Sequence, residues 1–583
     1  MHSHRRPHPK CFSLALSHTW ERDFDWLPSP KPGRRAEDVE PCSSRRVGHG
    51  VPSFSTRDTL LDCFLLIGWA GLIIACTSLH PSFMAHDEGN FAAEARFMSE
   101  SGRWLARSWW DRPVFTHGVL LNWLMVLSYK VFGMSIWAAR LPSAIASITA
   151  ILLTYDISRT ITGKRFLGFL TAAVLTVFHL WFQFSHLATQ DMLLVCLELL
   201  GIWGLLKAEA YPSQRVGWGF LSGIILGLGF LTKSFMILLP AVAIAPYLIF
   251  ENRRHRHLTN PGLYIGVFAG LALVGLWLWA SIAQYGDEVL RSLFGKISEL
   301  GEEAFHASDG PLYYFWNIPA NAFPWPLFSL IGVGFCWRER KAYNPYRWLL
   351  IYPFILFGML TSFATRTPYY TLQLFPFLAL FSAIALHRLA FQPSQWPRRW
   401  LSFAFSALGL ILFLLGLSVL LSLPLFSESL LVEIRPYAPV AIVLGLGWCA
   451  LLFTQAEPTR WLAAWLLPVW LTLGATGISG LYGDYSPELL ADLAQPSVAN
   501  VVSAQPVDFI VGDDWSDTDA HKTLVLLSFY TPQLGNYWRE LPGDELRSYA
   551  WLAPNVDGDE MSAIAPYEEV GRVQQFKLVR LVP

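Results

Sequence analysis

Long apolar runs separated by short polar loops dominate the chain, and this pattern predicts helices that span a membrane. Fourteen runs approach or reach the length that a helix needs to cross a bilayer. They lie near residues 59–80, 118–134, 141–158, 166–184, 192–206, 218–232, 235–250, 263–283, 323–337, 347–363, 370–390, 401–423, 437–454 and 460–481. The pattern therefore predicts an α-helical polytopic membrane protein.

Lysine and arginine are spread unevenly among the loops, and short cytoplasmic loops are the ones that collect them. The loops at 81–117, 284–322 and 424–436 are acidic or mixed, and we place them outside. The basic loops, which we place in the cytoplasm, lie at 159–165, 207–215, 251–257, 338–347, 388–399 and 455–460.

This assignment requires that one of the fourteen runs does not cross the membrane. The run at 118–134 is short and is interrupted by Asn122, Ser128 and Lys130. We expect it to lie re-entrant or flat at the outer face. About thirteen transmembrane helices then remain, with the N-terminus in the cytoplasm and the C-terminus outside.

Composition divides the chain into three regions. Residues 1–57 carry Arg, His, Pro and Ser without apolar periodicity and are expected to be a disordered cytosolic tail. Upstream sequence included by a misassigned start codon is the alternative. Residues 58–482 form the membrane domain. Residues 483–583 are acidic, and their apolar runs shorten to strand length, which predicts a small extracytoplasmic α/β domain.

Strand and helix signals alternate within this C-terminal region. The runs VDFIV (507–511), TLVLLSF (523–529) and QFKLVRLV (575–582) are expected to be strands. Residues 487–503 have a helical pattern broken at Pro496, and another short helix is expected after Pro532.

Composition agrees with a membrane location, since 53% of the 583 residues are hydrophobic and only 15% are charged. The formal net charge of -1 gives no indication of a nucleic-acid partner. None of the seven cysteines falls in the predicted outer loops or in the C-terminal domain, so we expect no disulfide framework. Nothing in the sequence indicates the oligomeric state.

Asp87 and Glu88 are the first candidates for chemistry, because they follow directly on the first apolar run. Charges next to hydrocarbon are costly, so they are commonly solvated or functional. A carboxylate at a shielded interface is suited to act as a general base, because partial burial raises its basicity. The alternative is that Asp87 caps the following helix. A Trp-rich aromatic belt at 104–110 marks the membrane surface.

Three further segments place polar groups at the predicted outer face. Asp191 follows an apolar run, and a helix cap is again the alternative. Lys233 stands against the usual inside bias, so it is either an anion-binding group or a lysine snorkelling to the interface. Arg366 with Tyr369 and Tyr370 suits a phosphate at headgroup depth, and an interfacial aromatic belt is the alternative for the tyrosines.

Taken together, these motifs resemble the GT-C membrane glycosyltransferases that use polyprenyl-phosphate-linked sugars. The resemblance is closest to the aminoarabinose transferase and protein O-mannosyltransferase-like group, and it runs from about residue 59 to 482. The matching motifs, in chain order, are Asp87-Glu88, Phe91-Ala92-Ala93-Glu94, Gly102-Arg103-Trp104, Phe132-Gly133, Ala138-Ala139-Arg140-Leu141-Pro142-Ser143, Ala188-Thr189-Gln190-Asp191-Met192, Phe230-Leu231-Thr232-Lys233, Gly310-Pro311 and Arg366-Thr367-Pro368-Tyr369-Tyr370.

This resemblance implies a GT-C fold in a bacterial inner membrane and transfer of a sugar from a polyprenyl-phosphate donor at the outer face. Its catalytic candidates are Asp87, Glu88 and Asp191, with Asp87 as the base. Groups expected to bind the lipid phosphate or substrate are Lys233, Arg366, Tyr370, His117 and His306. No cofactor is required by these motifs, and a divalent metal ion at Asp191 and Glu88 is left open.

One departure from the family pattern bears on the donor or acceptor. Where the family often has Lys-Pro-Pro-Leu, this chain has His117-Gly118-Val119-Leu120. The charge of a histidine depends on its surroundings, so His117 replaces the lysine only partly.

Two other classes of function compete with an enzyme. A lipid or sugar carrier would place ionisable groups at mid-membrane, and Glu198 within a predicted span is the feature that favours it. A non-catalytic scaffold would use the C-terminal domain to bind a partner outside.

Overall fold

The computed structural model describes residues 55–581, except 79–81, 111, 303–309, 339–345, 393–394, 482, 484, 513–517, 540–546 and 557–565. The side chains of Asp87 and of residues 296–302 are also outside the description. Three predictions therefore fall wholly or largely outside the described residues, namely the tail over residues 1–57, of which only 55–57 are described, the catalytic side chain of Asp87 and the substrate contact of His306.

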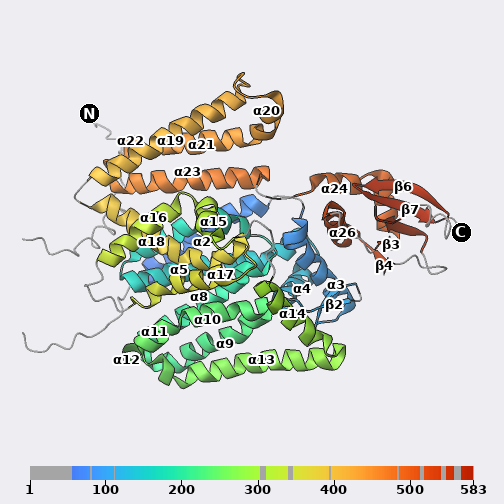
Figure 1. Ribbon diagram of the computed structural model, residues 1–583, viewed down its shortest axis with the longest axis horizontal. Helices are drawn as coiled ribbons and strands as arrows, with labels where there is room; N and C mark the ends of the chain where they lie inside the picture. The colour runs from blue at the N-terminus through green and yellow to red at the C-terminus, as the bar shows by residue number, and fades with distance from the viewer. Residues whose placement is uncertain are drawn as a thin grey trace, which may run out of the picture.

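Helices build the first four-fifths of the chain, and a smaller domain with a sheet projects from one end of the helical body (Figure 1). Each of the fourteen apolar runs is helical over most of its length. The α-helices are α2 (Thr56–Ser78), α3 (Asn90–Ser101), α4 (Leu120–Phe132), α5 (Ile136–Thr162), α6 (Arg165–Thr176), α7 (His179–Phe184), α8 (Gln190–Ala210), α9 (Arg215–Lys233), α10 (Leu238–Ala243), α11 (Ala245–Phe250), α12 (Asn252–His255), α13 (Pro261–Tyr285), α14 (Glu288–Glu302), α15 (Tyr313–Ala322), α16 (Trp325–Arg338), α17 (Tyr352–Ser362), α18 (Phe375–Phe391), α19 (Trp396–Leu420), α20 (Glu428–Ile434), α21 (Ala438–Cys449), α22 (Leu451–Thr454) and α23 (Pro458–Ser479).

Among the described residues, 8 helical segments are long and apolar enough to cross a membrane, or 9 if the bent pair α15 and α16 forms one span. The expected count of thirteen spans stays a prediction. Helix α4 has 13 residues and is not among these segments. A helix of that length rises only about 20 Å, short of the hydrocarbon thickness, in agreement with a run that does not cross.

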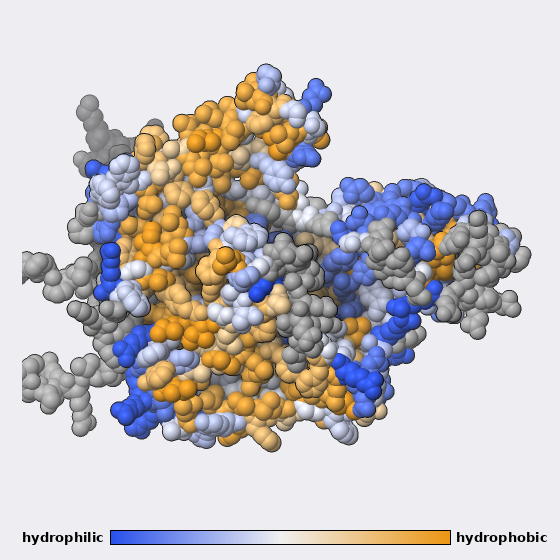
Figure 2. Space-filling model, viewed as in Figure 1, coloured by the Kyte–Doolittle hydropathy of each residue, from blue (hydrophilic) through white to orange (hydrophobic). Residues whose placement is uncertain are grey.

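Hydropathy divides the surface of the molecule (Figure 2). Apolar side chains cover the helical body, while hydrophilic ones cover the projecting domain and line the opposite end of the body. Basic residues at helix ends beside the loops predicted to be cytoplasmic pair with acidic ones: Arg165 of α6 with Asp62 at 2.7 Å and Lys207 of α8 with Asp156 at 2.7 Å. An apolar band between two polar ends is the surface that a bilayer requires.

Close packing of α9 on α13 fixes the helix that ends at Lys233. A side chain at Gly223 would lie 2.2 Å from Leu263 O, and one at Gly227 would lie 2.2 Å from Gly270 O. Small residues spaced by four allow two membrane helices to bring their backbones into contact. The position of Lys233 therefore depends on a rigid helix pair.

The projecting C-terminal domain carries a five-stranded sheet of order β4-β3-β5-β7-β6. Strand β3 pairs parallel with β4 and β5, whereas β7 pairs antiparallel with β5 and β6. Its elements are α24 (Pro487–Leu493), α25 (Pro496–Ala504), β3 (Val507–Ile510), α26 (Thr518–Tyr530), β4 (Leu534–Trp538), β5 (Tyr549–Leu552), β6 (Tyr567–Val573) and β7 (Phe576–Leu581). The predicted strands at 507–511 and 575–582 and the helix broken at Pro496 are confirmed.

Two predictions in this domain were wrong. The run 523–529 lies in helix α26, and every one of these residues is buried. An apolar run buried on all sides has the same appearance in a helix and in a strand, so the sequence favoured the wrong one. After Pro532 the chain forms strand β4 instead of a helix. Gly535 in that strand lies so close to β3 that a Cβ there would be 2.1 Å from Asp508 Oδ1.

The five described cysteines are free thiols, namely Cys63, Cys76, Cys196, Cys336 and Cys449. Cys11 and Cys42 lie outside the described residues.

Candidate active site

Glu88 is fully buried and holds together three segments that are distant in the sequence. It lies in a π-helical turn, η2 (Ala85–Gly89), and forms an ion pair with Arg140 of α5, whose Nε donates to Glu88 Oε2 at 3.0 Å. The backbone N–H of Met84 donates to Oε1 at 3.2 Å, and that of Ala188 donates to Oε2 at 3.1 Å. A second guanidinium nitrogen of Arg140 donates to Ser82 O at 3.0 Å. Both carboxylate oxygens of Glu88 are therefore occupied by protein donors.

Asp87 shares this π-helical turn, but its side chain lies outside the description. Helix caps fall elsewhere, because η2 is capped by Met84 and α3 by Gly89. The backbone geometry thus gives no support to the alternative that Asp87 serves as a helix cap.

Asp191 and Lys233 meet, although 42 residues separate them. Lys233 Nζ lies 2.5 Å from Asp191 Oδ1, and the two side chains are 7% and 10% exposed. Asp191 stands in the first turn of α8, whose N-cap is Thr189, so its carboxylate pairs with lysine instead of capping. Helix α9 ends at Lys233 because Ser234 adopts φ 49 and leaves the helical path. A buried and paired Lys233 is not a snorkelling lysine.

Two tyrosine rings complete this buried pair. Lys233 Nζ lies 4.8 Å from the ring centre of Tyr369 and 5.0 Å from that of Tyr370, both in the 3-10 helix η7 (Pro368–Leu374). An ammonium within about 6 Å of an aromatic centre is attracted by the ring. The predicted residues Asp191, Lys233 and Tyr370 therefore form one cluster, which we call the Lys233 cluster, with Tyr369 as a further member.

Arg366 lies beside the tyrosine segment and binds its own chain. Its Nη2 donates to Thr361 O at 3.1 Å and its Nη1 to Ala364 O at 3.4 Å. Tyr314 OH donates to Thr367 O at 3.2 Å, which holds the start of η7. These contacts position the segment that carries Tyr369 and Tyr370.

His117 ends a chain of polar contacts that sequence reasoning missed. Arg107 is buried, and it pairs with Glu94 at 2.9 Å and donates to Thr116 Oγ1 at 2.7 Å. Thr116 Oγ1 lies 3.1 Å from His117 Nδ1. Burial raises the pKa of Glu94, and Arg107 opposes that rise. An arginine fixed by a carboxylate thus orders the threonine that orients the imidazole. Glu94 stood in a recognised motif, but nothing in the sequence paired it with Arg107.

Contacts to the backbone place the segments of His117 and Glu88 next to the segments that carry Asp191 and Lys233. Gln190 Nε2 donates to Gly118 O at 3.4 Å. A Cβ at Gly118 would lie 2.0 Å from Leu231 O, so only glycine permits this approach. Ala188, which donates to Glu88, lies just before helix α8, whose first turn carries Asp191. Segments that meet here are 82–89, 116–118, 185–191, 231–233 and 366–370.

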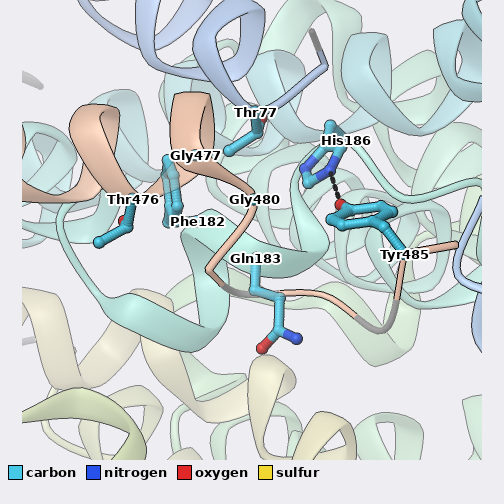
Figure 3. Close-up of a pocket in the computed structure, with 8 residues that line it drawn as sticks. All are labelled: Thr77, Phe182, Gln183, His186, Thr476, Gly477, Gly480 and Tyr485. Carbon is cyan, nitrogen blue, oxygen red and sulfur yellow. Dashed lines mark hydrogen bonds between the residues drawn. The ribbon is translucent and has the colours of Figure 1, made fainter. Parts of the chain in front are cut away.

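A small pocket opens beside these loops, between the ends of α2, α7 and α23 (Figure 3). His186 and Tyr485 face each other across it, with His186 Nε2 and the Tyr485 hydroxyl 3.3 Å apart. Tyr485 belongs to the segment that leads into the C-terminal domain.

Within the described part of the chain, no group of three or more His, Cys, Asp or Glu side chains is arranged to hold a metal ion. Glu88 has both oxygens bound by protein donors, and Asp191 is paired with Lys233. A divalent ion at these two carboxylates, which the sequence left open, would have to displace these protein partners.

Comparison with known proteins agrees with the resemblance to GT-C glycosyltransferases. Residues 116–279 match the family described as dolichyl-phosphate-mannose-protein mannosyltransferase. An undecaprenyl phosphate-alpha-4-amino-4-deoxy-L-arabinose arabinosyl transferase 1 of Pseudomonas fluorescens is 26% identical over 396 residues, which is 66% of this chain and 68% of that protein. The corresponding transferase of Pseudomonas aeruginosa is 26% identical over 429 residues, covering 70% of this chain and 74% of that protein.

Solved structures give the same fold. The crystal structure of ArnT from Cupriavidus metallidurans bound to undecaprenyl phosphate matches with a TM-score of 0.70 and 19% identity, over 90% of this chain and 98% of that one. Its apo state matches with a TM-score of 0.69 and 18% identity, over the same shares. The expected GT-C fold is therefore confirmed, together with the resemblance to the aminoarabinose transferase and protein O-mannosyltransferase-like group.

Proposed function

We propose that this chain, a membrane glycosyltransferase of the ArnT-like and protein O-mannosyltransferase-like type, moves a sugar from a polyprenyl-phosphate carrier to an acceptor at the extracytoplasmic face. The named relatives are transferases whose donor is an undecaprenyl-phosphate sugar. The acceptor is a lipid, a glycan or a protein.

The Lys233 cluster is the observation that carries this proposal. A buried ammonium flanked by two aromatic rings offers positive charge where water is scarce, and charge stabilisation there is worth more than in water. A lipid phosphate with its tail among apolar helices would present its anionic head at this depth. Asp191 holds Lys233 in place and would share its ammonium with a phosphate oxygen.

In the proposed reaction, an acceptor oxygen attacks the anomeric carbon of the sugar in a single inverting displacement. The new C–O bond forms as the C–O bond to phosphate breaks, and the polyprenyl phosphate leaves with the electron pair. Asp87 takes the proton of the acceptor. Phosphate is a good leaving group, so the protein contributes chiefly by positioning and by charge stabilisation.

Glu88 takes a supporting role in this proposal. Its carboxylate is bound on both oxygens, so it fixes the turn that carries Asp87 instead of reacting. His117 supplies a donor towards the phosphate from the loop beside the cluster, in place of the family's lysine. Arg366 and His306 are proposed as outer contacts of the donor or acceptor.

The orientation of the chain is also part of the proposal. The basic loops face the cytoplasm, and the Lys233 cluster and the C-terminal domain lie outside, as the charge bias of the loops indicates. To test this, single cysteines are introduced into the C-terminal domain or into loop 251–257, and whole cells that express each variant are treated with a membrane-impermeant thiol reagent. Labelling of the C-terminal domain alone is expected, and labelling of the loop alone would show that the orientation is the reverse.

Sugar transfer is tested with purified protein in nanodiscs and a radiolabelled undecaprenyl-phosphate sugar. Asp87→Asn is expected to abolish product, because the amide accepts no proton. Asp58→Asn is the matched control, since Asp58 pairs with Arg165 at the opposite end of the body and is expected to leave transfer intact. Full transfer by Asp87→Asn would reject Asp87 as the base.

The same preparation separates an enzyme from a carrier. Glu198, the feature that favoured a carrier, accepts a hydrogen bond from Tyr352 between two helices and is 4% exposed. That contact is typical of helix packing. Uptake of the labelled lipid-linked sugar into vesicles without product would favour the carrier, and neither uptake nor product would favour a scaffold.

A further inference from the structure

The loop that carries Asp87 and Glu88 is held by the C-terminal domain on one side through the segment at 485–486. Met84 and Tyr485 form an antiparallel bridge between their backbones. The backbone N–H of Ser486 donates to Ser82 Oγ at 3.0 Å, and Ser82 is fully buried. The first residues of segment 82–89 are therefore joined to the start of the C-terminal domain, 404 residues further along the chain.

Helix α26 holds the same loop through different atoms. The N–H of Phe83 donates to the hydroxyl of Tyr530 at 3.1 Å, and the ring of Phe83 lies edge-on to that of Phe529 at 4.8 Å. His86 Nε2 lies 2.9 Å from His521 Nδ1, at the other end of α26. A Cβ at Gly89 would lie 3.0 Å from Val525 Cγ1. The loop is thus contacted by residues of α26 from His521 to Tyr530.

Helix α26 is itself anchored on the membrane domain by Arg96 of α3. The guanidinium of Arg96 donates to four carbonyls, those of Ser528 and Phe529 in the last turn of α26 and those of Thr531 and Pro532 just after it, at 2.7 to 3.2 Å. A cation at this end of a helix satisfies carbonyls that have no partner within the helix. The anchor is buried and leaves α26 little freedom to shift against α3.

We propose that the C-terminal domain sets the position of the loop that carries Asp87, with Tyr530 as a positioning residue. One part of this inference, the expected loss of turnover, rests on the proposed function. Its structural part, the ordering of residues 82–89 by α26, stands on the contacts alone. In this proposal the C-terminal domain helps to build the reaction centre, in addition to any contact that it makes with an acceptor.

The hydroxyl of Tyr530 is the contact most suited to a test, because a single atom can be removed. Tyr530→Phe keeps the ring but leaves the N–H of Phe83 without this partner at a fully buried position. An unpaired buried donor is costly, so the loop is expected to move or fluctuate. Displacing a catalytic base by about 1 Å can lower the reaction rate on the order of 100-fold. A smaller displacement of the loop is therefore expected to cause a smaller loss of rate.

The experiment measures turnover and hydrogen exchange on full-length protein in nanodiscs. Tyr530→Phe is expected to lower kcat about 10-fold with KM for the donor lipid within about 3-fold, because positioning acts on the reaction more than on binding. Amides of residues 83–89 are expected to exchange faster, while those of α5 keep their protection. Tyr567→Phe is the matched control, since Tyr567 packs on the separate apolar cluster of Ile510, Ala550, Leu552 and Val579.

A second variant guards against a folding defect in the first. His521→Ala removes the contact with His86 near the N-terminal end of α26. It is expected to lower kcat and to speed exchange at 83–89, both by less than Tyr530→Phe does. Wild-type kcat together with wild-type exchange at 83–89 in both variants would overturn the inference. If the wild-type protein transfers no sugar at all, the proposed function fails, and the exchange measurement still decides whether α26 orders the loop.

Discussion

Removing the charge of Glu88 tests whether this carboxylate holds the acidic loop or reacts. Glu88→Gln keeps the shape of the side chain, but the amide nitrogen accepts no hydrogen bond. Arg140, which is 1% exposed, then loses its counter-ion in a buried position. One of the N–H groups of Met84 and Ala188 also loses its acceptor.

The size of the effect follows from this geometry. Breaking a buried ion pair by removing one partner costs about 3–5 kcal/mol, since the remaining charge is left uncompensated. An exposed pair is worth at most about 1 kcal/mol. Glu457→Gln is therefore the matched control, because Glu457 and its partner Arg460 have side chains that are 54% and 71% exposed.

The assay compares apparent melting temperatures of purified variants in one nanodisc preparation. Glu88→Gln is expected to melt well below the wild type, and Glu457→Gln close to it. The double variant Glu88→Gln, Arg140→Gln is expected to recover part of the loss, because two amides can bond to each other and a coupling of about 0.5–3 kcal/mol is usual for contacting pairs. A Glu88→Gln protein that melts like the control yet transfers no sugar would refute this reasoning and make Glu88 a reacting group.

Three further outcomes are expected. Lys233→Met is expected to lower kcat/KM by at least about 100-fold, since a buried charge contact is lost, whereas Lys233→Arg keeps measurable transfer; wild-type kcat/KM in the Met variant would remove the phosphate site from this cluster. Thr116→Val is expected to raise KM for the donor and shift its pH profile because His117 Nδ1 loses its contact with the Thr116 hydroxyl, while Thr116→Ser keeps both at the wild-type values; identical profiles for the two variants would contradict this. Burial and the neighbouring His86 lower the pKa of His521, so the docked domain disfavours its protonated form; the amides of 83–89 are therefore expected to lose protection, after correction for the pH dependence of intrinsic exchange, as the pH falls below the ordinary value of 6.5, and protection that stays constant or rises in acid would contradict it.

The apolar runs were sufficient to predict most helices, but two elements of the C-terminal domain were predicted wrongly, helix α26 as a strand and strand β4 as a helix. Residues 523–529 are apolar throughout, which suits a buried strand as well as a buried helix. This run is helical in the structure because polar residues from Thr518 onward extend the helix. In addition, Arg96 of α3 donates to the carbonyls at its C-terminal end. A partner more than 400 residues away in sequence leaves no local signal.

The sequence by itself determined that the chain is a helical membrane protein with an acidic C-terminal domain, and its short motifs identified Asp191, Lys233 and Tyr370 as candidates. These features are local, since the length of an apolar run and the order of a motif can be read without the fold. Only the tertiary structure decided that Lys233 pairs with Asp191, that Glu88 is occupied by Arg140, and that α26 rests on the loop of Asp87. The physical reason is that the packing of whole helices decides which side chains form ion pairs and which backbones touch. Packing brings together residues that are far apart in the sequence, so no local pattern predicts their contact.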